Sequence, residues 1–269
     1  MLATELNLPA WGVMWLLAVV IYFGCKAAAW SVAPRPVSWK RRVAFLVAWP
    51  GMDGREFATG TCKQPPRTKE WLFVAAKLIC GIMMLSWASM NAGSESLVAG
   101  WIAMIGIVFT LHFGLFHLLS CLWRSVGIEA TPLMNWPVAS HSLSDFWSNR
   151  WNRAFRDLAS QFLFRPLSRR VSPAMALFLS FVASGFVHEL VIAVPAGEGY
   201  GGPTLFFGIQ AAGILLERST MGKKWGLNRG LTGWLFATTL LLLPVPLMLP
   251  PVFVHRVILP FVAFLRMGS

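Results

Sequence analysis

The sequence contains apolar runs long enough to cross a lipid bilayer, and these runs restrict what the chain can fold into. A bilayer core about 30 Å thick is crossed by a helix of roughly 20 apolar residues. Composition agrees, because 56% of the residues are hydrophobic and only 13% are charged, against roughly 25% charged in soluble domains. We therefore predict an all-α, polytopic transmembrane helical bundle that forms a single domain over residues 1–269. About seven spans are expected, near residues 9–32, 71–90, 98–123, 172–196, 203–217, 231–248 and 250–265.

The loops between these runs differ sharply in basic residues, within a net charge of +12. Residues 33–70 contain eight Lys or Arg, residues 124–171 contain seven and residues 218–230 contain four, whereas residues 91–97 and 197–202 contain none. Short cytoplasmic loops of membrane proteins are enriched in Lys and Arg. The pattern predicts cytoplasmic basic loops and an N-terminus outside, and it argues against nucleic-acid binding. Attraction of anionic lipid head groups or of a phosphorylated substrate is compatible with it.

Two segments of the basic loops have an organisation of their own. Val43–Trp49 is apolar but too short to span, and Pro50-Gly51 ends it, so we expect a re-entrant or interfacial segment. Residues 141–166 are predicted to form one amphipathic helix that begins at Ser142, and an interfacial helix with a solvated polar face is the simplest interpretation. Its apolar face comprises Leu143, Trp147, Trp151, Phe155, Leu158 and Phe162, and its polar stripe comprises Asp145, Asn149, Asn152 and Arg156.

Several chemistries are not supported by the sequence. The four cysteines form no CxxC pair and have no spacing with histidine that suggests zinc, so neither a disulfide framework nor a metal site is expected. There is no GxSxG nucleophile elbow and no phosphate-binding glycine-rich motif. The first apolar run has no basic region before it and no cleavage site of small residues, so it is expected to be a retained span.

His188 stands inside the fourth predicted span, with Glu189 beside it. An ionisable residue within a membrane is costly and is a functional-site hypothesis by default, and histidine exchanges protons near neutral pH. A structural histidine bonded to another helix is the alternative. The segment from His188 to Ile192 lacks the second histidine of a metalloprotease helix. His112 and His117 are expected to serve packing.

Three segments resemble the wax-synthase-like branch of the membrane-bound O-acyltransferases. Ser142-Leu-Ser-Asp-Phe-Trp-Ser-Asn-Arg-Trp-Asn152 is similar to the signature of that branch, roughly S-L-x-D-F-W-G-R-R-W-N, except that Ser148-Asn149 replaces Gly-Arg. Trp49-Pro-Gly-Met-Asp53 resembles another segment of the branch, and Ser184-Gly-Phe-Val-His188-Glu189 resembles the second family motif. Together these segments cover 22 residues, and the combination of an asparagine and a histidine motif is fairly specific.

The resemblance implies an O-acyltransferase in which Asn152 and His188 occupy the two catalytic positions. His188 would take the proton of the attacking hydroxyl, and Asn152 would position or polarise the carbonyl. The expected partners are acyl-CoA as co-substrate, a hydroxylated lipid such as a fatty alcohol, diacylglycerol or sterol, and the membrane lipids, with no cofactor and no metal. The residues expected to contact substrate are Trp147, Trp151, Asp145, Arg150, Arg153 and Glu189.

Two other functions remain open from the sequence. The first keeps the fold but transfers the acyl group to a sugar, a polyketide or another small polar alcohol. The second is non-enzymatic, a transporter or scaffold in which His188 and Glu189 form a proton relay or a structural pair. A transporter would favour broken helices in two related halves, and the sequence has no such symmetry.

Overall fold

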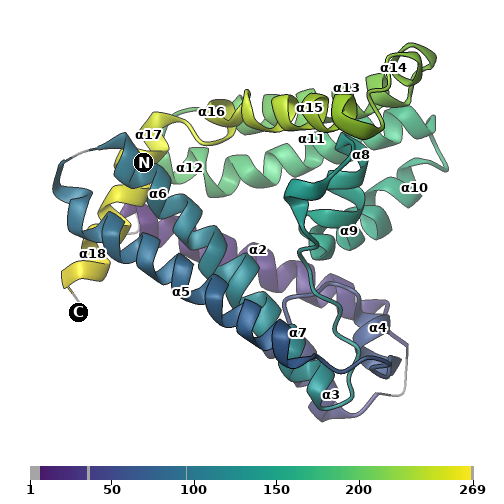
Figure 1. Ribbon diagram of the computed structural model, residues 1–269, viewed down its shortest axis with the longest axis horizontal. Coiled ribbons are helices and arrows are strands. Elements are labelled where there is room, and N and C mark those ends of the chain that lie inside the picture. The colour runs from purple at the N-terminus through teal and green to yellow at the C-terminus, as the bar shows by residue number, and fades with distance from the viewer. Residues whose placement is uncertain (1–6, 35–36, 95, 268–269) are drawn as a thin grey trace. The chain divides into compact units, whose positions relative to one another are not determined.

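The computed structural model describes residues 7–34, 37–94 and 96–267 (Figure 1). Arg35, one of the basic residues of the first loop, lies outside them. The chain divides into two compact units. Unit 1 comprises the residues up to Ala18 together with 136–151 and 159–261, and unit 2 comprises 19–135, 152–158 and 262–269. A single domain over the whole chain stays a prediction.

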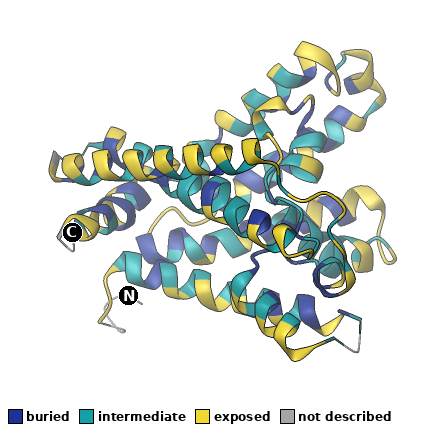
Figure 2. Cartoon of the chain, turned by 60° about the horizontal axis from the view of Figure 1, so that its bottom comes forward, coloured by how far each residue is buried: buried dark blue, intermediate teal, exposed yellow. Residues whose placement is uncertain are grey.

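The all-α membrane fold is confirmed. The described residues form helices, and their only β feature is an isolated bridge between Thr61 and Ile128. Five helices are long and apolar enough to cross a membrane, and only 11% to 39% of their most apolar windows is buried within the protein. The remaining surface of these helices is available to lipid, as the exposed residues along them in Figure 2 indicate. The five are Ala10–Ser31, Thr68–Asn91, Leu97–Ser125, Pro173–Ala196 and Gly230–Met248.

The expected count of seven spans is not confirmed. The two remaining predicted segments are helical, but helix α13 (Gly202–Arg218) has 17 residues and the last helical stretch runs only from Pro251 to Met267. At 1.5 Å per residue, 17 residues cover about 26 Å, which is shorter than the bilayer core. The corresponding apolar runs, residues 203–217 and 250–265, are also the two shortest of the seven in the sequence.

Unit 1 is organised around an antiparallel pair of helices, α11 (Pro173–Val191) and α13. Helix α8 (Leu143–Asp145) packs against α13 and α15 (Gly230–Leu242), and the core of this unit comprises Leu143, Leu177, Ala211, Ile214 and Ala237. The other elements of this unit are η3 (Pro137–Ala139), η4 (Phe146–Arg150), η5 (Ser160–Phe164), α10 (Arg165–Leu167), α12 (Ala193–Ala196), α14 (Thr220–Lys224), α15 (Gly230–Leu242), α16 (Val245–Met248), α17 (Pro251–Phe253) and η6 (Val254–Ile258).

Unit 2 contains a second antiparallel pair, in which α5 (Thr68–Asn91) packs along α6 (Leu97–Val108), η2 (Phe109–Leu115) and α7 (Phe116–Ser125). Close packing of the pair depends on glycine, because a Cβ at Gly81 would lie 2.4 Å from the Thr110 hydroxyl. The remaining helices of this unit are α3 (Trp39–Ala48), α4 (Gly54–Thr59) and η1 (Ala92–Ser94). Three helices have residues in both units, namely α2 (Ala10–Ser31), α9 (Arg153–Ala159) and α18 (Leu259–Met267).

The apolar segment predicted to be re-entrant or interfacial is the second half of α3. This helix begins with the Ser38 side chain as its N-cap and ends at Trp49, before Pro50. One face buries Phe45 in the core of unit 2, whereas Trp39, Val43 and Val47 are exposed. A ten-residue helix with exposed apolar side chains is consistent with a position at the membrane surface.

Candidate active site

His188 lies in the last turn of α11, in unit 1. This helix begins where the sequence predicts, because Ser172 accepts a hydrogen bond from the Met175 N–H and Pro173 occupies the first turn. The His188 side chain is half-buried, and its Nδ1 lies 2.7 Å from the Ser184 carbonyl oxygen. A carbonyl can only accept, so Nδ1 carries the proton in the neutral ring and Nε2 carries the basic lone pair.

Within unit 1, one aromatic side chain joins His188 to the signature segment. The ring of Phe207, on α13, lies 4.6 Å from the His188 ring and 5.6 Å from the Trp147 ring, measured between centroids. Phe207 is buried, and Trp147 also packs edge-on against Phe181 of α11. The histidine motif and the first half of the signature therefore belong to one packed aromatic cluster, although about 40 residues separate them in sequence.

Two buried polar residues of α13 hold the signature segment in place. The Glu217 Oε2 accepts from the backbone N–H of Leu143 at 2.7 Å and of Ser144 at 3.3 Å. Gln210 accepts from the Trp147 Nε1 at 3.3 Å and donates to the Leu240 carbonyl at 2.7 Å. Sequence reasoning missed both residues. Their signal was available, because they are polar positions seven residues apart, on one face of a largely apolar helix.

The predicted continuous helix over residues 141–166 was wrong. The helix is interrupted at Trp151, which is extended, and at Asn152, whose φ is +40°. Asn152 starts the next helix, because its Oδ1 accepts from the Phe155 N–H at 3.2 Å. Asparagine tolerates positive φ and is a preferred N-cap, which explains the break at this position. The expected polar stripe therefore does not continue through Asn152.

The break leaves the Asn152 side chain with a defined direction. The backbone of Asn152 and Arg153 is held in unit 2, since the Asn152 N–H approaches the Met134 sulfur at 3.2 Å and the Arg153 N–H donates to Leu133 O at 3.0 Å. With Oδ1 engaged in the cap, Nδ2 is the donor that the amide offers. Asn152 belongs to unit 2 and His188 to unit 1, so their pairing stays a prediction.

The polar residues of the signature in unit 1 bind one another. Arg150 forms an ion pair with Asp145 and donates to the Trp136 carbonyl, and Asn149 donates to Asp145 at 3.1 Å. Burial raises the pKa of the Asp145 carboxyl, but hydrogen bonds from Arg150, Asn149 and the His141 backbone outweigh burial and hold that pKa below its ordinary value. The ion pair between Asp145 and Arg150 thus links two positions within the signature segment.

The expected substrate contacts Trp151 and Arg153 flank Asn152 in the chain. In unit 1 the Trp151 ring stacks on the Phe146 ring, with centroids 5.6 Å apart. In unit 2 the charge of Arg153 lowers the pKa of both Glu56 and Asp157, yet burial outweighs it and keeps each pKa above its ordinary value. Arg153 therefore compensates two partly buried carboxyls.

Glu189, the neighbour of His188, points to a different partner. Its Oε1 accepts from the Thr204 backbone N–H at 3.1 Å and the Thr204 hydroxyl at 2.9 Å, in the first turn of α13. The two helices approach closely there, because a Cβ at Gly185 would lie 2.5 Å from the Thr204 Cα. Glu189 accordingly satisfies a helix N-terminus and joins α11 to α13.

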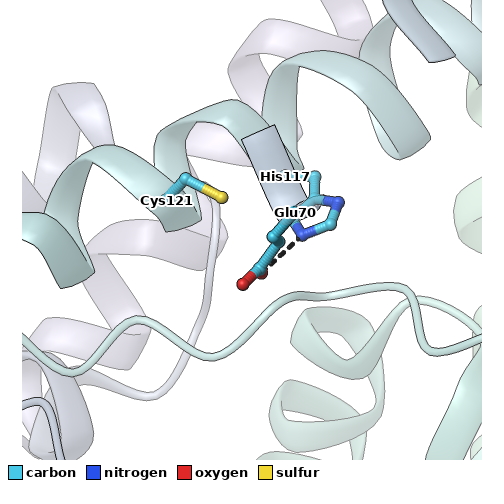
Figure 3. Close-up of side chains that lie close together, drawn as sticks. All are labelled: Glu70, His117 and Cys121. Atoms are coloured by element: carbon cyan, nitrogen blue, oxygen red, sulfur yellow. Dashed lines mark hydrogen bonds and ion pairs between the residues drawn. The ribbon is translucent and has the colours of Figure 1, made fainter. Parts of the chain in front are cut away.

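A second group of ionisable side chains lies in unit 2, between α5 and α7 (Figure 3). Potential metal-ligand atoms of Glu70, His117 and Cys121 all lie within 4.8 Å of one another. The His117 Nε2 bonds to the Glu70 carboxyl at 2.9 Å, and its Nδ1 lies 2.7 Å from the Lys77 Nζ. Arg124 pairs with Glu70 and approaches the Cys121 sulfur at 3.6 Å. The guanidinium and ammonium groups thus take the interactions that a metal ion would need, so this group is better interpreted as a charged tie between the helices.

Lys26, in the first apolar helix, is another residue that sequence reasoning missed. In unit 2 its ammonium group is fully buried, donates to the carbonyls of Trp49 at 2.9 Å and Gly51 at 2.7 Å, and lies over the Phe45 ring. It therefore fixes the Trp49–Asp53 segment, whose last residue caps α4. A lone lysine in an apolar run was the available signal.

The central segment of the chain is similar to a known protein family. Residues 130–209, which include both motifs, match the Membrane bound O-acyl transferase family. Three relatives are similar to parts of the chain. They are a probable long-chain-alcohol O-fatty-acyltransferase 3 of Arabidopsis thaliana (30% identity over 38% of this chain and 33% of the relative), a long-chain-alcohol O-fatty-acyltransferase of Simmondsia chinensis (29% over 37% and 32%) and an acyl-CoA–sterol O-acyltransferase 1 of Arabidopsis thaliana (31% over 32% and 27%).

These matches confirm the resemblance to the wax-synthase-like branch of the family. Together with the apolar helices they support an integral, multi-pass membrane protein. The matched segments span about a third of the length of these three relatives.

Proposed function

From the match of residues 130–209 to the membrane bound O-acyl transferases, we propose that this chain transfers an acyl group from acyl-CoA to the hydroxyl of a lipid alcohol. The observation that carries the proposal is the packing of His188 and Trp147 on the same buried Phe207. This packing joins the family's histidine motif to its signature segment. The printed names of the relatives favour a long-chain alcohol or a sterol as acceptor.

His188 is assigned the role of general base. Its Nδ1 is bonded to the Ser184 carbonyl, so Nε2 accepts the proton of the acceptor hydroxyl as the hydroxyl oxygen attacks the thioester carbonyl. The C–S bond then breaks, and the imidazolium returns the proton to the departing thiolate of coenzyme A. General acid–base catalysis of this kind typically contributes 10²–10⁴-fold.

Asn152 is assigned the stabilisation of the carbonyl oxygen. Negative charge develops on that oxygen in the tetrahedral intermediate, and a preoriented donor in a water-poor site stabilises the charge. The cap that Asn152 forms with Phe155 fixes the amide and presents Nδ2 as the donor. We propose that this donor acts on the carbonyl of the same thioester whose attack His188 promotes, with water excluded during the transfer.

The other expected site residues divide into two groups by their contacts. Trp151 and Arg153 flank Asn152, and we propose that they contact acyl-CoA directly, the ring by stacking on the adenine and the guanidinium by attracting phosphate. Trp147, Asp145, Arg150 and Glu189 are bonded within unit 1. We propose that these four shape the substrate site by holding α8, η4, α11 and α13 together.

We propose further that the loops at residues 33–70, 124–171 and 218–230 face the cytoplasm, where acyl-CoA is made available, and that the N-terminus lies outside. Their Lys and Arg content supports this orientation. Single cysteines at Ser125 and Tyr200, placed in a cysteine-free background, can be labelled with a membrane-impermeant reagent. Labelling of position 125 but not of position 200 from outside intact cells would refute the orientation.

The experiment that tests the proposed function compares cells with and without the protein. Neutral lipids would be extracted after feeding a long-chain alcohol, a sterol or a diacylglycerol, and the esters quantified by mass spectrometry. The account expects an ester of at least one of these alcohols to accumulate only with the protein. Unchanged ester profiles for all three acceptors, at verified membrane expression, would contradict it.

A further inference from the structure

One end of unit 1 is strongly cationic. Helices α11 and α13 pack antiparallel, so the beginning of α11 and the end of α13 lie together. Figure 1 shows α10 and α14 at this same end of the pair. These helix ends, α10, α14 and the segments that connect them carry exposed basic side chains. We call this group of side chains the basic rim. The basic rim comprises Arg165, Arg169, Arg170, Arg218, Lys223, Lys224 and Arg229.

Apart from Glu217, the residues of the basic rim have no acidic residue close to them in the sequence. Neither the stretch from Leu158 to His188 nor the stretch from Arg218 to the end contains an Asp or Glu. The preceding Glu217 is buried and bound to the backbone of α8. Among the described residues, none of the rim cations forms an ion pair with a carboxyl group. Seven like charges in one region repel one another unless an external anion compensates them.

Exposed apolar side chains accompany these cations. Met221 is 50% exposed, Trp225 57% and Leu231 72%, and Val171 and Met175 are exposed beside the arginines. The rim also adjoins two candidate spans, since Pro173 begins one and Gly230 begins the other. Tryptophan and long apolar side chains next to basic residues are typical of the membrane–water boundary.

We infer that the basic rim binds the head groups of anionic phospholipids in the leaflet that it faces. The cations match the phosphate charge, arginine can bind phosphate in a bidentate manner, and the neighbouring apolar side chains enter the acyl layer. A soluble phosphorylated ligand would leave Met221, Trp225 and Leu231 in water. The inference depends on contacts within unit 1 and is independent of the proposed acyl transfer.

The test uses the purified full-length chain in mixed micelles or nanodiscs of phosphatidylcholine with increasing phosphatidylglycerol. Bound lipid is counted by native mass spectrometry, and the melting temperature is measured in parallel. One variant combines Arg169→Gln, Arg170→Gln, Lys223→Gln and Lys224→Gln. A charge-matched control combines Lys40→Gln, Arg42→Gln, Lys63→Gln and Lys69→Gln, which are exposed cations of unit 2.

The parent is expected to bind phosphatidylglycerol in preference to phosphatidylcholine and to melt at a higher temperature with it. The rim variant should bind phosphatidylglycerol at least about tenfold more weakly, and the control should bind like the parent. Salt at about 0.5 M should weaken the binding by the parent, because these charges are exposed. Should the fourfold variant fail to fold, Lys223→Gln with Lys224→Gln alone is measured, with an expected partial loss.

Three results would overturn the inference. They are equal binding of phosphatidylcholine and phosphatidylglycerol by the parent, undiminished binding by the rim variant, and an equal loss in rim variant and control. Inorganic phosphate is included as a separate probe without lipid. If it displaced phosphatidylglycerol at millimolar concentration, the rim would be a site for soluble phosphate and the assignment to lipid would be wrong.

Discussion

The Glu217 carboxyl group accepts a hydrogen bond from the backbone N–H of Leu143 at 2.7 Å, although 74 positions separate them in the chain. This contact fixes the start of the signature segment to the end of α13. Arg218 reinforces it by donating to the Ser144 hydroxyl at 3.1 Å. The signature is therefore positioned by a helix that carries no recognised motif of its own.

Replacing Glu217 with alanine should destabilise unit 1. The substitution leaves the N–H groups of Leu143 and Ser144 without their acceptor in a buried place, a loss of about 1–3 kcal/mol. A lower melting temperature in detergent is expected. Glu198→Ala is the matched control, because its ion pair with Arg256 is exposed and contributes at most about 1 kcal/mol. Equal effects of the two substitutions would rule out the positioning role.

Lys26→Met should loosen the Trp49–Asp53 segment. The side chain keeps its length but cannot donate to the carbonyls of Trp49 and Gly51, so about 1–3 kcal/mol is expected to be lost for each buried acceptor left unpaired. Faster proteolysis near Trp49 in the folded protein would report the loosening. The exposed Lys40→Met serves as control. A Lys26→Met protein as stable and as protease-resistant as the parent would show that the contacts contribute nothing.

Glu56→Gln should stabilise the protein at neutral pH. Burial, with the like charges of Asp53 and Glu129, raises the pKa of Glu56. Because its pKa is raised in the folded state, Glu56 contributes to the free energy of unfolding in a pH-dependent way. This contribution is fully present below the ordinary carboxyl pKa of about 4.3 and is lost as the pH rises through the raised pKa. Glutamine keeps the acceptor for Thr131 and does not ionise. The melting temperature of the variant, relative to that of the parent, should therefore increase between about pH 4 and pH 7.

Asp145→Asn should change the melting temperature in the opposite direction, and it is measured over the same pH range. The pKa of Asp145 is lowered in the folded protein, so its contribution is present above the ordinary value of about 3.9 and is lost only as the pH falls through the lower value. The variant should be less stable than the parent across pH 5–7, by a constant amount. For the Glu56→Gln variant, a melting-temperature advantage over the parent that narrows with rising pH would contradict the argument that burial raises the pKa of Glu56.

Asn152→Asp separates the cap from the donor. Aspartate keeps an oxygen for the Phe155 N–H and tolerates the positive φ, but it lacks the Nδ2 donor. Turnover is expected to fall roughly 10²–10³-fold while the melting temperature changes little. Asn149→Ala is the matched control and should retain turnover. If Asn149→Ala proved more damaging, the alignment of the signature with the family would be wrong, and mild, equal losses would favour a non-enzymatic role.

The sequence anticipated the five long apolar helices because each carries enough apolar residues to span a bilayer without help from its neighbours. The break at Asn152 was missed, since the apolar positions from Leu143 to Phe162 keep helical spacing across it. Long-range contacts to Leu133 and Met134 override that spacing. The partners of His117 could not be foreseen either, because Glu70 and Lys77 lie 47 and 40 positions away. Local periodicity contains no information about such pairings.

The central claim is tested most directly by ester formation from a radiolabelled long-chain acyl-CoA and a fatty alcohol with the purified parent, His188→Ala and His255→Ala. His255 is exposed and serves as the control. The account predicts that the parent and His255→Ala form labelled ester, and that His188→Ala, with an unchanged melting temperature, is slower by 10²–10⁴-fold. Ester formation by His188→Ala within a few-fold of the parent would contradict the assignment of His188 as the base.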